Sequence, residues 1–145
     1  MKMYVALLLY ASAATAFAGL GSAPSTPGPR ILSQSASTGA TSATYTDLKE
    51  TLESGTEVHE YVNAQGTVFA VSWSGPFLPD LREVLGVKFD TMVNHVRQRA
   101  GGGRSQVRVQ QDDVVIFSGG RPGGFSGRAW MPALLPAGFD TNAVR

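Results

Sequence analysis

The sequence predicts an α+β domain in which one amphipathic helix packs across an antiparallel sheet of about four to six strands. Three observations support this fold class: a β-hairpin pattern over residues 56–73, an amphipathic helix pattern that begins at Asp80, and further strand patterns after residue 105. Strands, then a helix, then strands is an α+β order. We expect a single domain over residues 45–136, followed by a loose tail over residues 137–145.

The first half of the domain is predicted to form strands. Residues 45–52 alternate loosely, and residues 56–62 and 67–73 are rich in β-branched and aromatic side chains. Turn-forming residues 63–66 lie between the last two runs, which predicts an antiparallel hairpin. Because side chains alternate across a strand, we expect Phe69, Val71 and Trp73 to share one face.

The helix pattern starts where prolines end the preceding strand. Pro79 suits a first helical turn, and from Asp80 onward apolar residues recur at steps of three and four. This predicts an amphipathic helix with a bend at Gly86 and an end near the glycines at 101–103. We expect its residues Phe89 and Val93 to pack on the face of the sheet that carries Phe69, Val71 and Trp73.

Strand patterns return after the helix. Residues 106–110 and 114–117 read as a second hairpin that turns at residues 112–113, and residues 125–131 read as a last strand. Paired glycines at 119–120 and 123–124 flank Arg121 and Pro122, which predicts a loop with positive φ angles or close backbone contacts.

The first 18 residues have the pattern of a secretory signal peptide. Lys2 precedes an uncharged stretch rich in Leu and Ala, which is shorter than the ~20 residues of a membrane-spanning helix. Ala16 and Ala18 place small side chains where signal peptidase requires them, so we expect cleavage before Gly19. The alternative is an uncleaved anchor. We expect an exported protein, in the periplasm or released from the cell, with no stable membrane span after cleavage.

Residues 19–44 are dominated by Gly, Ser, Ala, Thr and Pro, with Ile31 and Leu32 as the only large apolar pair. Such a composition buries too little apolar surface to offset the entropy of ordering, which predicts a flexible tether. The alternative is a strand over residues 30–34 that docks on the domain.

Composition excludes several functions. The chain has no cysteine, so disulfides, cysteine nucleophiles and cysteine-based zinc sites are excluded. Loss of Lys2 would leave the basic residues equal to the 11 acidic ones, which disfavours nucleic acid as a partner. Acidic residues gather over 47–60 and arginines over 97–128. We expect the two sets to neutralise one another across the folded surface, with a basic binding face as the alternative.

No catalytic, cofactor or metal motif is complete. The triglycine at 101–103 follows a helix and lacks the lysine of a phosphate-binding loop. Ser126 lies in Gly-Phe-Ser-Gly, where Arg128 replaces the last glycine of a nucleophile elbow. His59 and His95 have no metal-ligand partner at helical spacing. We therefore assign no catalytic residue, cofactor or metal ligand.

Two functional hypotheses remain. The first is a non-enzymatic module that binds an envelope protein, peptide or glycan through loops near residues 73–80 and 119–127. Its candidate surface comprises Trp73, Phe77, Asp80, Arg121, Phe125 and Arg128. The rival is a small hydrolase or acyl-transfer enzyme whose site assembles in space from His59 with Ser126 or Asp80.

Three blocks of the sequence resemble a known family. They are residues 58–86, which include Val-Ser-Trp-Ser-Gly-Pro-Phe-Leu-Pro-Asp, the Ser-Gly-Gly at 118–120, and Gly-Arg-Ala-Trp-Met-Pro-Ala-Leu-Leu-Pro-Ala-Gly at 127–138. Over about residues 45–140 the chain is similar to an exported proteobacterial family known only as a domain of unknown function, number twenty-eight forty-four. The resemblance implies a Gram-negative envelope protein and implies no activity, cofactor or catalytic residue.

Overall fold

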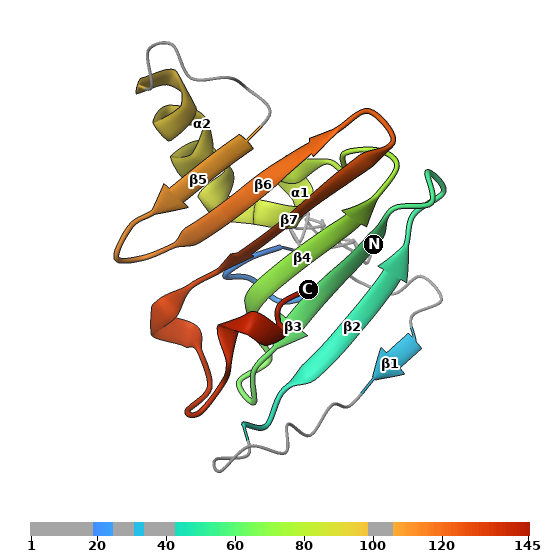
Figure 1. The fold of residues 1–145 in the computed structure, drawn as a ribbon. Coiled ribbons are helices and arrows are strands. Elements are labelled where there is room, and N and C mark those ends of the chain that lie inside the picture. Colours follow the sequence, from blue (N-terminus) through green and yellow to red (C-terminus); the bar gives the residue numbers. More distant parts are fainter. Residues whose placement is uncertain (1–18, 25–30, 34–42, 99–105) are drawn as a thin grey trace, which may run out of the picture.

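The computed structural model describes residues 19–24, 31–33, 43–98 and 106–145. Seven antiparallel strands form one sheet in the order β1-β2-β3-β4-β7-β6-β5 (Figure 1). Their bounds are β1 Ile31–Ser33, β2 Thr46–Thr51, β3 Glu57–Val62, β4 Val68–Gly75, β5 Gln106–Gln110, β6 Val115–Arg121 and β7 Gly124–Trp130. The α+β class is confirmed, and the short strand β1 extends the expected sheet.

Both predicted hairpins are present. Strands β3 and β4 pair around a turn in which the Asn63 Oδ1 accepts hydrogen bonds from the backbone N–H groups of Gln65 and Thr67. Strands β5 and β6 pair from Gln106 opposite Gly119 to Gln110 opposite Val115. Strand β7 then inserts between β6 and β4 and joins the two halves of the sheet.

The helix is broken into three pieces: α1 Leu81–Leu85, the 3-10 turn η1 Gly86–Lys88, and α2 Phe89–Gln98. Asp80 caps the first turn, since its Oδ1 accepts the N–H of Arg82 at 2.8 Å. Gly86 has φ 51°, which only glycine adopts readily, and the predicted bend at this residue is confirmed. The glycines at 101–103 lie outside the described residues.

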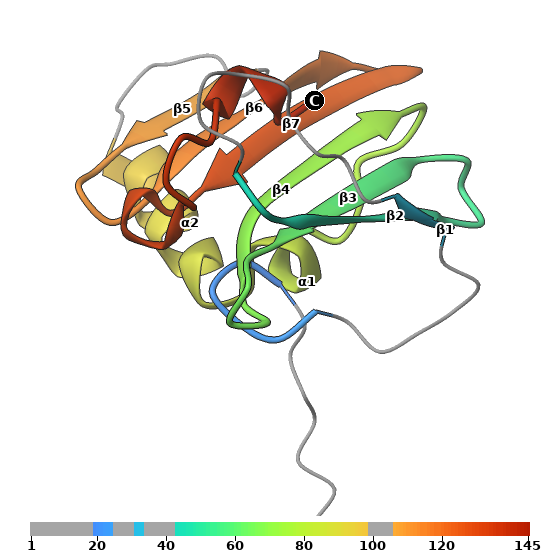
Figure 2. The same ribbon diagram turned by 90° about the horizontal axis from the view of Figure 1, so that it is seen from below.

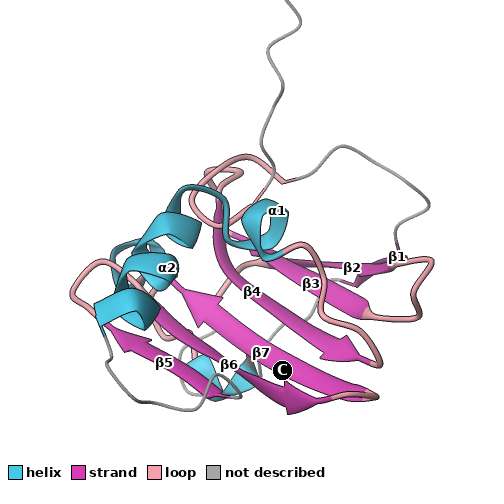
Figure 3. Ribbon diagram, turned by 90° about the horizontal axis from the view of Figure 1, so that it is seen from above, coloured by secondary structure: helices cyan, strands magenta, loops and turns pink. Residues whose placement is uncertain are grey.

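The sheet separates two apolar clusters, because α1 and α2 cover one face and the C-terminal segment covers part of the other (Figures 2 and 3). We call these the helix face and the open face. The helix-face core contains Leu20, Val58, Val62, Val68, Val71, Trp73, Val84, Leu85, Met92, Val109, Val114, Ile116 and Ala129. The open-face cluster contains Tyr61, Phe69, Ala70 and Val144, packed by Tyr45, Trp130, Leu134, Leu135 and Phe139.

Phe69 corrects the prediction that three side chains of β4 share one face. Tyr61 lies opposite Ala70 but Val62 lies opposite Val68, so Phe69 is the extra residue of a β-bulge. A bulge shifts the alternation by one residue. Val71 and Trp73 therefore join the helix-face core, whereas Phe69 packs on the open face.

Segments expected to be loose are packed at both ends of the domain. Leu20 is 0% exposed, the N–H of Gly21 donates to the Val68 carbonyl at 2.8 Å, and the N–H of Val68 donates to Ser22 at 2.9 Å. Strand β1 pairs with β2, as in the docked alternative for residues 30–34. Residues 19–24 and 31–33 are thus docked, because one buried leucine and a few backbone hydrogen bonds suffice to hold a short segment. The expected tether over residues 25–30 and 34–42 lies outside the described residues.

The expected C-terminal tail also packs. It follows the 3-10 turn η2 Pro132–Leu134 and carries the 3-10 turn η3 Thr141–Ala143, and it crosses the open face so that Phe139 and Val144 enter the cluster around Phe69. The predicted signal peptide, residues 1–18, lies outside the described residues, which begin at Gly19. No helix in the described part of the chain is long and apolar enough to cross a membrane.

Candidate binding groove on the open face

A row of side chains crosses the open face from β2 to the edge strand β5. Antiparallel partners place their side chains on the same face, and the register aligns one residue from each of β2, β3, β4, β7, β6 and β5. The row is Lys49, His59, Ser72, Arg128, Phe117 and Arg108. Positively charged or ionisable side chains therefore dominate the middle of this face.

The C-terminal segment covers the part of the row over β3 and β4. Tyr61 donates its hydroxyl to the Ala143 carbonyl at 3.4 Å and accepts the N–H of Arg145 at 3.3 Å. The Ser72 hydroxyl donates to the Arg145 carbonyl. Burial is the main cause that raises the pKa of Tyr61, so its phenol stays neutral and keeps its proton for this contact.

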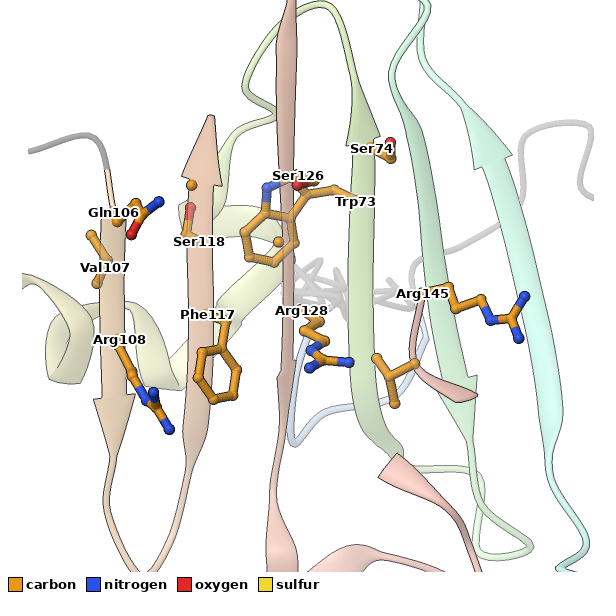
Figure 4. Close-up of a pocket in the computed structure, with 13 residues that line it drawn as sticks. Trp73, Ser74, Gln106, Val107, Arg108, Phe117, Ser118, Ser126, Arg128 and Arg145 are labelled. Atoms are coloured by element: carbon orange, nitrogen blue, oxygen red, sulfur yellow. The ribbon is translucent and has the colours of Figure 1, made fainter. Parts of the chain in front are cut away.

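The uncovered half, over β7, β6 and β5, is a groove of about 540 Å³. Figure 4 shows Arg108, Phe117 and Arg128 side by side along it, whereas the side chain of Arg145 points away from them, toward β2. The lining residues are Trp73, Ser74, Gln106, Val107, Arg108, Phe117, Ser118, Gly119, Ser126, Gly127, Arg128, Val144 and Arg145. None of them is acidic, so the groove is cationic.

Aromatic rings support the two groove arginines. The guanidinium carbon of Arg108 lies 5.1 Å from the centre of the Phe117 ring, and that of Arg128 lies 5.5 Å from the same ring. Arg128 also lies 5.7 Å from the Trp130 ring. Within the described residues, no carboxylate is at ion-pair distance from Arg108 or Arg128. Both guanidinium groups thus lie on aromatic rings and have no carboxylate partner among the described residues.

Both lysines in the described structure are paired with carboxylates. Lys49 contacts Glu57 at 2.6 Å and Lys88 contacts Asp113 at 2.7 Å. Each lysine lowers the pKa of its carboxylate partner, mainly through the hydrogen bond between them. The two groove arginines have no such carboxylate partner among the described residues.

Gly127 and Trp73 both line the groove and lie in close contact with each other. Gly127 lies opposite Trp73 in the β4–β7 pair, and a Cβ built on it would overlap the indole ring. Trp73 is 1% exposed and belongs to the helix-face core, and its Nε1 has no hydrogen-bond partner in the part of the protein that is described. Glycine is required here because the tryptophan occupies the space of a side chain.

The structure does not assemble the predicted hydrolase site. Ser126 lies opposite Ser74, two register positions from the row that contains His59, and Asp80 caps α1. His59 instead contacts Asp47, with 2.8 Å between Nδ1 and Oδ1, and lies opposite Ser72.

Asp47, His59 and Ser72 thus lie on three neighbouring strands, but no nucleophile is presented. The Ser72 side chain is fully buried and donates to the Arg145 carbonyl. No group of three or more His, Asp and Glu that would suit a metal ion occurs among the described residues.

The predicted interaction residues do not form one surface. Phe77, 62% exposed, and Asp80 follow β4, while Arg121 and Phe125 lie in the β6–β7 hairpin at the same end of the sheet. Arg128 lies in the groove, and Trp73 is a core residue. Reasoning from sequence did not single out Arg108 or Phe117 as site residues, because only the register of the strands brings them to Arg128.

One family model, described as "Protein of unknown function (DUF2844)", matches residues 16–144. No curated protein and no solved structure matches the chain.

Proposed function

The chain belongs to the DUF2844 family, and from this premise we propose that it is an exported binding module whose open-face groove holds its ligand or partner. The observation that carries the proposal is the pair of arginines, Arg108 and Arg128, which lie on aromatic rings without an acidic partner in the described structure. Charged side chains held by packing at a concave surface are typical of binding sites.

The rival hydrolase has weaker support. His59 has an acidic partner in Asp47, but the serine opposite it is buried beneath the C-terminal segment. Acyl transfer requires a nucleophile that the substrate can reach. Binding needs only the exposed side chains of the groove.

Export is part of the proposal and rests on the sequence of residues 1–18. A basic residue, an apolar stretch and Ala-Phe-Ala before Gly19 are the features of a cleavable signal peptide. N-terminal sequencing of the protein from an envelope fraction tests it: a chain that begins at Gly19 supports export, and a chain that retains Met1 opposes it.

Because the chain contains no cysteine, single cysteines can report which surface is occupied. Ser126→Cys places a thiol in the groove, and Glu53→Cys places one on the exposed turn between β2 and β3. We expect a maleimide to label both thiols in the purified protein. In envelope extract of the native cells, labelling at position 126 should slow while labelling at position 53 does not. Equal labelling at both positions in the extract would oppose the groove as the binding site.

A further inference from the structure

We propose that the groove binds an anionic oligosaccharide, whose carboxylates Arg108 and Arg128 hold. This inference rests on the proposed function and specifies the ligand class of the same site. It follows from the charge of the groove, the spacing of the arginines and the chemistry of the sheet face.

Charge complementarity points to an anion. The groove lining contains no acidic residue, and Arg108 and Arg128 have no carboxylate partner in the described chain. Contact with the Phe117 ring uses none of the five N–H donors of a guanidinium. These donors form a planar fork that matches the two oxygens of a carboxylate.

The spacing of the arginines points to a ligand with more than one anionic group. Arg108 is on β5 and Arg128 on β7, with β6 between them. Neighbouring strands lie about 4.8 Å apart, so the two backbone positions are roughly 10 Å apart across the sheet. The guanidinium groups are thus placed to meet carboxylates on different sugar units of one chain that crosses the strands.

The sheet face disfavours an acidic peptide as the ligand. Strands β4, β7 and β6 are paired on both sides, so their main-chain N–H and C=O groups are used within the sheet, and only the edge strand β5 has one unpaired side. Extended peptides gain affinity by adding a strand alongside a free edge, whereas a ligand that contacts both arginines must run across β7, β6 and β5 and cannot pair with the β5 edge in that way.

The side chains around the arginines suit sugar hydroxyls. Ser74, Ser126 and Gln106 line the groove, are exposed, and both donate and accept hydrogen bonds. Half-buried Phe117 adds an apolar surface between the two arginines. A glycan can use all of these groups without requiring any main-chain partner.

The test is calorimetric titration of the full mature chain with three probes: oligogalacturonate, which carries a carboxylate on each sugar, neutral dextran of similar length, and poly-glutamate. We expect binding of oligogalacturonate that weakens as salt concentration rises. Arg108→Ala and Arg128→Ala should each weaken it about tenfold, the loss that accompanies one charge-assisted hydrogen bond.

Arg82→Ala is the matched control. Arg82 is also exposed and lies 4.5 Å from an aromatic ring, that of Phe89, but it is on the helix that covers the other face. Its replacement should leave affinity unchanged, and all three variants should keep the melting temperature of the parent.

Any of the following outcomes would contradict an anionic oligosaccharide as the ligand. If poly-glutamate binds as tightly as oligogalacturonate, the groove recognises negative charge and not a sugar chain. If dextran binds as tightly, the arginines do not favour an anionic glycan over a neutral one. Absence of oligogalacturonate binding, together with protection of Ser126→Cys in envelope extract, rejects the glycan and keeps the groove as a binding site. Absence of both rejects the proposed function as well.

Discussion

Replacement of Leu20 by alanine should strongly destabilise the domain, although composition places this residue in a flexible tether. The side chain is 0% exposed and packs in the helix-face core. Its N–H donates to the Val84 carbonyl of α1 at 3.2 Å, and the next two residues exchange hydrogen bonds with Val68 at the start of β4. The segment therefore closes the core between the helix and the sheet.

The expected loss follows from complete burial. Leu→Ala at a buried site removes about 2 to 5 kcal/mol, because the lost transfer free energy and the cavity add. We expect about 3 kcal/mol for Leu20, since a short segment near a chain end relaxes into part of the space. For a domain of this size, that loss lowers the melting temperature by on the order of 10 °C or more.

Urea denaturation of the mature chain, followed by circular dichroism, measures the change in the free energy of unfolding. Leu78→Ala is the matched control, because Leu78 is 47% exposed and its truncation should change stability by less than about 0.5 kcal/mol. If Leu20→Ala proves as mild as Leu78→Ala, the segment is the flexible tether that its composition predicts, and the reasoning from burial is refuted.

Three further results are expected from the same denaturation assay. Phe69→Ala should cost about 3 to 5 kcal/mol, whereas Phe77→Ala should be nearly neutral; equal effects would contradict the assignment of Phe69 to a core. Gly127→Ala should cost about 1 to 3 kcal/mol and shift tryptophan fluorescence, because its Cβ displaces the Trp73 indole; an unchanged spectrum and stability would contradict that contact. The pKa of Tyr61 is raised above 10.0 in the folded chain, so its contribution to stability is complete below that pH and falls as pH rises further; Tyr61→Phe should reduce this fall, and an unchanged pH profile would count against it.

The sequence by itself determined the elements of the fold. The turn chemistry of residues 63–66, the alternation in 106–117 and the spacing of apolar residues from Leu81 onward are local signals. Each needs only near neighbours in the chain, so hairpins, helix and bend could be predicted. The family was also recognisable from the sequence, because its blocks span most of the domain.

The face on which Phe69 packs and the place of Leu20 were predicted from local sequence, but both depend on tertiary structure. The face of Phe69 follows from a bulge, which depends on how β3 and β4 pair and not on alternation within β4. Likewise Leu20 is isolated among small and polar residues, yet it is buried because α1 and β4 leave a space that it fills.

The groove was decided by tertiary structure alone. Arg108, Phe117 and Arg128 come from three strands, and nothing in their separate positions along the chain indicates that they are adjacent. The contact between Asp47 and His59 likewise could not be predicted from their separate positions along the chain. Strand register is set by the burial of both sheet faces together, which is a non-local free energy, so a single sequence specifies the strands but not which side chains meet across them.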